Sequence, residues 1–402
     1  MKIAIVTGNP LRYGGKGSYI LGELGYFVGR GHEIVLIYWS DPRVYIPERH
    51  PSEEVCKKIR TIRFEPVHGG ILRGPIYLLF NALYFSFFIR HLSKIAKISA
   101  IHAHDPAVAF GVSLAGMGKK TILHVHSPYQ KDKFIIDAPL SNLKLKTRIR
   151  ALVNHPFDML LVLLVYNIVR HTLCLSEFEY DDVKSKTVTN KKVWIIRNGV
   201  DVSTFRPKET ESPVKPSMLQ GKFIALFVGR MVNKNGPMLI AEAARMLENL
   251  GDNKTLFVFA GDGPEKQPMH EFIKRNDLKN ILLLPWTPMK DVIHYADVFI
   301  SHVSPMVEGH GLTIIEAMSS GIPVITGRDT IKEKLFKHKR DVFFIDKDDP
   351  LQIVDAIRTL QIDKELRHTI SVNARKTVED KFDNAKSMKL VEMLLFEYGH
   401  QR

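Results

Sequence analysis

The stretch "KFIALFVGRMVNKNGPMLIAEAARMLENL", residues 222–250, decides the fold of this chain. Its first part is a short apolar run rich in aromatic and β-branched residues, which is typical of a buried strand, and its last part has helical spacing. Gly236 and Pro237 mark the turn and the start of the helix. Because the apolar run at 255–260 follows closely, the sequence predicts a βαβ unit, which joins parallel strands.

The same order opens the chain. A strand at 2–8 is followed by the glycine-rich loop "NPLRYGGKGS" at 9–18, a helix at 19–33 and a second strand at 34–40. Further short apolar segments alternate with helical periods, at residues 100–105, 121–127, 280–285, 298–303, 323–327 and 342–345. This alternation predicts α/β architecture, with parallel sheets covered by helices on both faces.

A chain of 402 residues with 45% hydrophobic content is long enough to bury more than one core. Turn residues and charges gather around residues 205–218. We therefore expect one domain at 1–205 and a second at 206–384, with a C-terminal helix at about 385–402 that packs back on the first. In parallel sheets of this kind, ligands bind at the carboxyl ends of the strands.

The formal charge of +14 is concentrated in the first half of the chain. Residues 1–200 carry 28 Lys and Arg against 15 Asp and Glu, whereas residues 201–402 carry 29 against 28. A basic half can face nucleic acid, anionic lipid or a phosphorylated substrate, and charge alone does not choose among these. No zinc-finger spacing or other nucleic-acid module accompanies it, so we expect no nucleic-acid partner.

The two cysteines, Cys56 and Cys174, are too few for a disulfide framework or a four-thiolate metal site. The apolar run at residues 3–6 is far shorter than a secretory signal requires. Both observations favour a reducing, cytoplasmic location.

Two longer apolar stretches, at 76–89 and 159–166, are each shorter than the roughly 18 residues that a membrane-spanning helix requires. We interpret the second as a buried core helix. The first is aromatic on nearly every face and is followed by basic residues, so it is as consistent with docking at a membrane interface as with burial. Basic residues at 131–150 would suit an anionic headgroup, although a solvated basic face is the commoner case.

The glycine-rich loop resembles two phosphate-binding motifs but matches neither. A dinucleotide fingerprint needs a third glycine where Ile20 stands, and a Walker A loop needs Ser or Thr where Gly17 follows Lys16. What remains at Gly14 and Gly15 is a bare backbone between a strand and a helix, which can hold a phosphate.

Two glutamates, Glu308 and Glu316, lie eight positions apart around a glycine-rich turn. We predict a helix that begins near Leu312 and ends at "SSG", residues 319–321. Its N-terminus would offer backbone donors to an anion, from Gly309 to Thr313. The two carboxylates should then bracket a bound phosphate rather than pair with each other.

Here the sequence resembles the retaining glycosyltransferases of family 4, which have the GT-B fold of two Rossmann-like domains facing each other across a cleft. The resemblance covers most of the chain. Its motifs are the Gly14-Gly15 loop, "RGHEI" at 30–34, "IHAHD" at 101–105, "HVHS" at 124–127, "RNGVD" at 197–201 with Phe205, "VGRMVNKNG" at 228–236, "AGDGPE" at 260–265 and the E-x7-E segment.

The resemblance implies a role for each matching residue. Glu316 would accept from the ribose hydroxyls of a nucleotide sugar, while Glu308 and His126 would face the transferred sugar. Arg230 would hold the diphosphate. The remaining donor-binding residues would be Gly14, Gly15, Lys234, Asn235, Gly309, His310, Gly311, Leu312 and Thr313.

Two positions depart from the family pattern. Asn235 stands where the family usually has a lysine, and we assign the neighbouring Lys234 to the phosphate site. His310 stands where the family has an aromatic residue, and it could add a donor to the phosphate or the sugar.

Two possible metal sites are set aside. "DKD" at 346–348 imitates the metal-binding D-x-D of other transferases, but the family has an ordinary acidic loop there. His102, His104, His124 and His126 alternate on two expected strands and could crowd together. We expect no metal at either place, and no cofactor besides a UDP- or GDP-sugar substrate.

The sequence therefore predicts a retaining hexosyltransferase that uses a nucleotide sugar, with a glycan, lipid-linked or phosphorylated acceptor, in cell-surface glycan or glycolipid synthesis. We expect it in the cytoplasm, at the inner face of the membrane if the basic half binds anionic lipid. Two alternatives remain: a GT-B sugar-nucleotide epimerase or hydrolase, and a non-catalytic membrane-associated subunit that binds nucleotide sugar.

Overall fold

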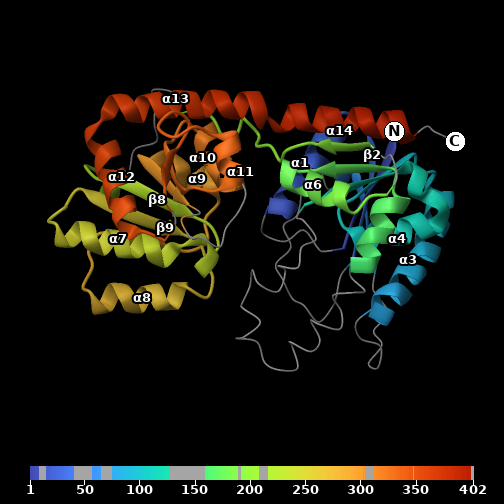
Figure 1. The fold of residues 1–402 in the computed structure, drawn as a ribbon, viewed down its shortest axis with the longest axis horizontal. Coiled ribbons are helices and arrows are strands. Elements are labelled where there is room, and N and C mark those ends of the chain that lie inside the picture. The colour runs from blue at the N-terminus through green and yellow to red at the C-terminus, as the bar shows by residue number, and fades with distance from the viewer. Residues whose placement is uncertain are drawn as a thin grey trace. The chain divides into compact units, whose positions relative to one another are not determined.

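The computed structural model describes residues 1–8, 15–39, 57–64, 75–126, 159–188, 192–207, 216–301, 303, 311–346 and 348–399. The chain divides into two compact units, shown by the ribbon in Figure 1. The first comprises Met1–Asn198 and Ala385–Arg402, and the second comprises Gly199–Asn384.

The first unit ends earlier than the predicted boundary at residue 205. Val200 forms a β-bridge with Asp383, and its amide donates to the carbonyl of Phe382 at 2.8 Å. The carbonyl of Phe205 accepts hydrogen bonds from Ser319 and Arg375. These contacts place residues 199–205 in the second unit.

The sheet of the first unit has seven parallel strands in the order β3-β2-β1-β4-β5-β6-β7. Its strands are β1 Lys2–Thr7, β2 Glu33–Trp39, β3 Ile59–Phe64, β4 Ala100–Ala103, β5 Thr121–Val125, β6 His171–Cys174 and β7 Lys192–Ile195. The central strands β1, β4 and β5 consist almost wholly of buried residues, as parallel strands covered on both faces should.

Helices cover both faces of this sheet. They are α1 Gly15–Gly29, α3 Pro75–Ala96, α4 Pro106–Val112, α6 Glu177–Ser185, α14 Asn384–Gly399 and helical residues 159–168. On one face α1 and α14 pack around Ile3, Ile5 and Phe27, and on the other α3 and α4 pack around Val6 and Phe85. The C-terminal helix α14 is held to the first unit by Glu392, which contacts His32 Nε2 at 2.7 Å and accepts from Tyr26 Oη at 3.1 Å.

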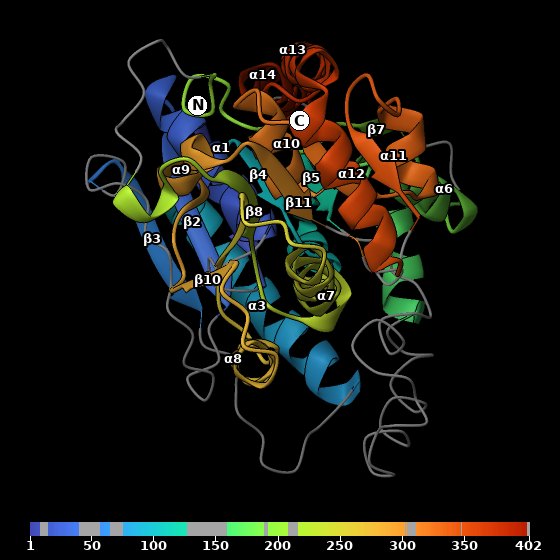
Figure 2. The same ribbon diagram turned by 90° about the vertical axis from the view of Figure 1, so that its left-hand side faces the viewer.

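The sheet of the second unit has six parallel strands in the order β10-β9-β8-β11-β12-β13. The strands are β8 Phe223–Val228, β9 Thr255–Ala260, β10 Ile281–Leu284, β11 Val298–Ser301, β12 Val324–Gly327 and β13 Phe343–Ile345. The helices are α7 Pro237–Asn249, α8 Lys266–Arg275, α9 Met289–Val292, α10 Leu312–Ser319, α11 Thr330–Leu335, α12 Pro350–Ile362 and α13 Lys364–Lys381. The sheet lies between α7 and α12 on one face and α10 and α13 on the other (Figure 2).

No helix within the described ranges is both long enough and apolar enough to span a bilayer. Residues 159–168 bury Val162, Val165 and Tyr166 but expose Leu160 and Leu164, so the prediction of a buried core helix is right for one face only. Among the described side chains of α3, at residues 82–92, the exposed large apolar ones are Leu83, Tyr84 and Phe87.

Candidate functional site

The path of the chain through the second sheet changes direction between its two central strands. From β8 the chain runs outward through β9 to β10, and it then crosses back to place β11 on the other side of β8. At such a switch point the loops after the two central strands part, and ligands bind between them at the carboxyl ends. Arg230 lies directly after β8, and α10 is the helix that follows β11.

The loop after β8 is held by its own hydrogen bonds. The carbonyl of Arg230 accepts from the amide of Val232 at 2.9 Å and from the side-chain amide of Asn235 at 2.8 Å. Arg230 itself is exposed, and Lys234 is half-buried. Asn235 therefore fixes the loop that presents Arg230, a role that its place in the sequence motif did not reveal.

Two glycines of "AGDGPE" allow the neighbouring loop to pack against this one. A Cβ atom at Gly261 would lie 2.0 Å from the carbonyl oxygen of Gly229, and one at Gly263 would lie 2.4 Å from that of Met231. The amide of Met231 donates to the carbonyl of Asp262 at 2.8 Å. Only glycine permits this approach, so these residues set the position of the Arg230 loop.

Helix α10 spans Leu312–Ser319, and Gly321 follows its end with φ +69°. The predicted start and end of this helix are confirmed. Gly311 precedes it with φ 65°, and within the described part of the chain no side chain caps its first amides. The amides of Leu312 and Thr313 are thus the positive end of the helix, suited to an anion. Glu316 lies about one turn into the helix and is half-buried. The predicted site residues Gly14, Glu308, Gly309 and His310 lie outside the described residues.

The far end of α10 is fastened by Arg375 of α13. Its Nη1 donates to the carbonyls of Ser319 at 2.8 Å, Phe205 at 2.6 Å and Val202 at 3.1 Å. One guanidinium thus ties α10 to the segment that enters the second unit. Sequence reasoning did not single out Arg375, because its partners are backbone carbonyls and leave no motif.

In the first unit, Asp105 organises the start of α1. Its carboxylate accepts from the amide of Gly8 at 2.6 Å, the hydroxyl of Thr7 at 3.2 Å and the ammonium of Lys16 at 2.5 Å. Gly15 is the first residue of α1. Lys16, which suggested a phosphate-binding lysine, is therefore an internal link between α1 and β4.

His126 directly follows β5 and belongs to a buried cluster. Its Nε2 lies 2.8 Å from Nδ1 of His104, and Nε2 of His104 lies 2.9 Å from the Glu23 carboxylate of α1. His102 is hydrogen-bonded through Nδ1 to Glu23, and the His124 ring stacks on that of His126. Burial, reinforced by the neighbouring imidazoles, holds the pKa values of His104, His124 and His126 well below the usual value. These three rings are therefore neutral at pH 7.

Two protein-family models match the chain and show which family it belongs to. The model described as "Glycosyltransferase Family 4" matches residues 13–204, and the model described as "Glycosyl transferases group 1" matches residues 208–377. The chain belongs to glycosyltransferase family 4. The first model spans the unit that carries His126, and the second spans Arg230 and α10.

Curated relatives and solved structures agree with this assignment. The UDP-Gal:alpha-D-GlcNAc-diphosphoundecaprenol alpha-1,3-galactosyltransferase of Escherichia coli is 28% identical over 54% of this chain and 57% of its own length. The capsular polysaccharide biosynthesis glycosyltransferase CapM of Staphylococcus aureus is 28% identical over 46% of this chain and 50% of its own. The chain thus spans about half the length of the curated relatives it matches.

The crystal structure of Anabaena HepE in complex with UDP and glucose superimposes with a TM-score of 0.73 at 15% identity, over 99% of this chain and all of that one. The fold of this family 4 member is therefore GT-B, as predicted.

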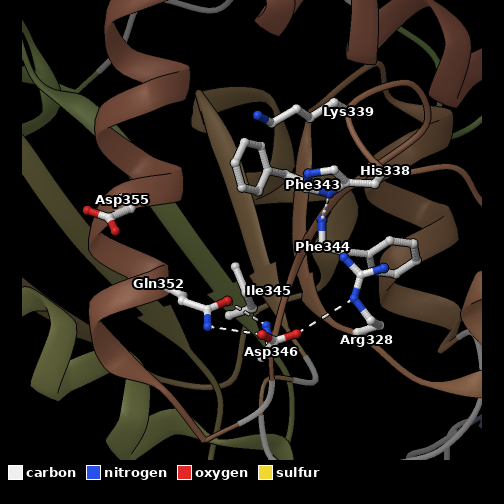
Figure 3. A pocket seen from close by; sticks show the side chains of 9 residues that line it. All are labelled: Arg328, His338, Lys339, Phe343, Phe344, Ile345, Asp346, Gln352 and Asp355. Carbon is white, nitrogen blue, oxygen red and sulfur yellow. Dashed lines mark hydrogen bonds and ion pairs between the residues drawn. The ribbon is translucent and has the colours of Figure 1, made fainter.

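A separate hollow of about 280 Å³ lies beside β13 and α12 (Figure 3). Of the residues that line it, Arg328 pairs with Asp346 at 3.7 Å and also with Glu333 at 2.7 Å, and His338 Nδ1 accepts from the amide of Phe344 at 3.0 Å. Since β13 is an edge strand, this hollow is distinct from the switch point between β8 and β11. Asp346 of the "DKD" segment takes part in this ion pairing.

Proposed function

We propose that this family 4 member is a retaining glycosyltransferase that moves a hexose from a nucleotide sugar to an acceptor hydroxyl. The observation that carries the proposal is the placement of Arg230 and the N-terminus of α10 after the two neighbouring central strands β8 and β11. A guanidinium and a helix N-terminus that converge from adjacent strands are suited to the two phosphates of a sugar nucleotide.

The proposed mechanism stabilises the leaving group. As the bond between the anomeric carbon and the phosphate oxygen breaks, its electron pair goes to the diphosphate, where Arg230 and the α10 amides stabilise the charge. The acceptor oxygen bonds to the anomeric carbon from the same face, and its proton passes to the departing phosphate. Glu316 would hold the ribose hydroxyls, and His126 and Glu308 would position the sugar. Because these groups supply the positive charge, we propose that transfer needs no metal ion.

The acceptor is proposed from the chemistry of the first unit. The first half of the chain is strongly basic, and α3 exposes Leu83, Tyr84 and Phe87. The relative from Escherichia coli is named for a diphosphoundecaprenol-linked substrate. A lipid-linked acceptor met at the inner face of an anionic membrane fits both observations. The UDP and glucose named with Anabaena HepE favour a UDP-sugar as the donor.

The test is a transfer assay with the full chain. UDP- and GDP-sugars are incubated with and without undecaprenyl-diphosphate-linked saccharides, and both nucleotide release and the product are measured. We expect release that requires acceptor, together with a product that keeps the anomeric configuration of the donor. Nucleotide release without acceptor would instead identify a hydrolase or epimerase, and donor binding without turnover would identify a non-catalytic subunit. Sedimentation with anionic vesicles at low salt tests the membrane step, since absence of binding there contradicts it.

A further inference from the structure

Four buried side chains of the first unit converge between α1 and the sheet. His102 lies on β4, His104 follows its last residue, His124 lies on β5, and Glu23 reaches them from α1. Successive side chains of a strand alternate between faces, so residues two apart share the α1 side. All four residues are at most 2% exposed. A core position in a small α/β unit seldom holds so many titratable groups without a task.

Several nitrogen and oxygen atoms of this cluster have no hydrogen-bond partner among the described residues. They are His102 Nε2, His104 Nε2, both ring nitrogens of His124 and Glu23 Oε2. His104 Nε2 and Glu23 Oε2 lie 2.9 Å apart, but the angle between the two groups does not allow a hydrogen bond. Both atoms therefore lack a hydrogen-bond partner although they are close. Because an unsatisfied buried polar atom costs about 1–3 kcal/mol, such a cluster requires a ligand to explain it.

The geometry of the cluster suits a metal ion. One ring nitrogen from each of His102, His104 and His124 can be chosen so that all lie within 4.8 Å of one another. A tetrahedral zinc site, with bonds of about 2.0–2.1 Å, needs nitrogens about 3.3 Å apart, so the rings would have to close by up to about 1.5 Å around the ion.

The outer contacts of the rings also match a metal site. Glu23 bonds the Nδ1 of His102, and His126 contacts the Nδ1 of His104, so the Nε2 of each ring is the nitrogen left for an ion. Carboxylates and other groups on the outer nitrogen of a ligating histidine are the usual means of fixing its tautomer.

We propose that His102, His104 and His124 bind one divalent ion of the zinc class, with Glu23 positioning His102. Imidazole donors suit zinc among the common divalent ions, and three protein ligands leave the fourth tetrahedral position to a ligand such as water. The ion would join α1, β4 and β5 and hold His104 against His126. This revises the expectation from the sequence, which set these histidines aside, and it is independent of the transfer chemistry proposed above.

The test measures metal content and stability rather than activity. The full chain is purified without a metal-affinity tag from cells grown with added zinc, then dialysed and analysed by elemental mass spectrometry. We expect about one zinc per chain in the wild type and a large loss in His124→Phe, which keeps the ring but removes both nitrogens. The matched control is His171→Phe, which changes another buried core histidine on the adjacent strand β6 and should keep the wild-type content.

A chelator should lower the melting temperature of the wild type and of the control but leave His124→Phe unchanged. Should His124→Phe fail to fold, X-ray absorption of the wild type gives the ligands directly, and we expect nitrogen neighbours at about 2.0 Å. Wild-type protein with no zinc and no response to zinc or chelator would overturn the proposal. Equal zinc in His124→Phe, or an ion coordinated only by oxygen, would overturn it as well.

Discussion

Gly261→Ala tests whether close backbone packing positions the Arg230 loop, to which we assign binding of the diphosphate. The added Cβ would lie 2.0 Å from the carbonyl oxygen of Gly229, whereas real Cβ contacts are essentially never below 3.0 Å. The two loops must therefore separate by at least 1.0 Å. Because Gly229 directly precedes Arg230, the guanidinium moves with the loop.

We expect the substitution to lower both catalysis and stability. A misplacement of about 1 Å in a positioning group can cost about 100-fold in rate, so we expect a loss of that order in kcat/KM for the nucleotide sugar. Overpacking of a tight contact should lower the free energy of unfolding by about 1–3 kcal/mol. Initial rates over a range of donor concentration give the first quantity, and urea denaturation gives the second.

A matched control separates loop displacement from backbone strain. Gly221, unlike Gly261, has a left-handed backbone, at φ +70°, and a Cβ there meets no atom within 4 Å, so alanine adds backbone strain without a close contact. Gly221→Ala should therefore cost about 1–2 kcal/mol of stability and leave kcat/KM unchanged. If folded Gly261→Ala keeps the wild-type kcat/KM, or if both variants lose it equally, the packing argument is wrong.

Three further substitutions test contacts that stabilise each unit internally. Arg375→Met removes charged hydrogen bonds to three carbonyls and should lower the free energy of unfolding by about 2–4 kcal/mol in urea, and a loss below about 1 kcal/mol would contradict this. Gly199→Ala would place a Cβ 2.6 Å from the backbone of Asn384, so we expect a stability loss of about 1–3 kcal/mol or more, whereas a wild-type melting temperature would count against it. Burial raises the pKa of Glu392, but hydrogen bonds from His32, Tyr26 and Arg30 outweigh it and leave the pKa below its usual value. This carboxylate therefore adds stability above its unfolded pKa of about 4.3, and the addition disappears as the pH falls through the lower folded pKa. Glu392→Gln should be less stable than the wild type at pH 7, with a difference that shrinks in acid; a difference independent of pH would refute the assignment.

The sequence predicts those features of the fold that local patterns encode. The strand runs and both ends of α10 follow from apolar periodicity and helix-stop residues, and the structure confirms them, whereas α1 begins at Gly15, inside the loop predicted at 9–18. The order of strands does not follow in the same way, because it depends on pairing between segments far apart in the chain. The domain boundary was misplaced for a related reason. Residues 199–205 read as the end of one domain, but their hydrogen bonds reach Phe382 and Arg375 near the end of the other.

The same distinction between local patterns and contacts distant in sequence applies to the candidate site. Arg230 and Glu316 could be assigned because their motifs are local. Glu23 could not, since a glutamate in a helix is ordinarily solvated, and only the approach of α1 to β4 and β5 shows that it is buried among histidines. Asn235 occupies a motif position, and its side-chain amide also bonds the carbonyl of Arg230, a contact that the motif does not show.

The most direct test of the central claim is calorimetric titration of the full chain with UDP and GDP, and then with the corresponding sugar nucleotides. We predict saturable binding of one nucleotide class by the wild type. Binding should weaken about tenfold or more in Arg230→Met, which loses the charged contact to the diphosphate, and also in Glu316→Ala, which loses the ribose contact. If the wild type binds neither nucleotide, or if both variants bind as tightly as the wild type, the donor site does not lie between β8 and β11.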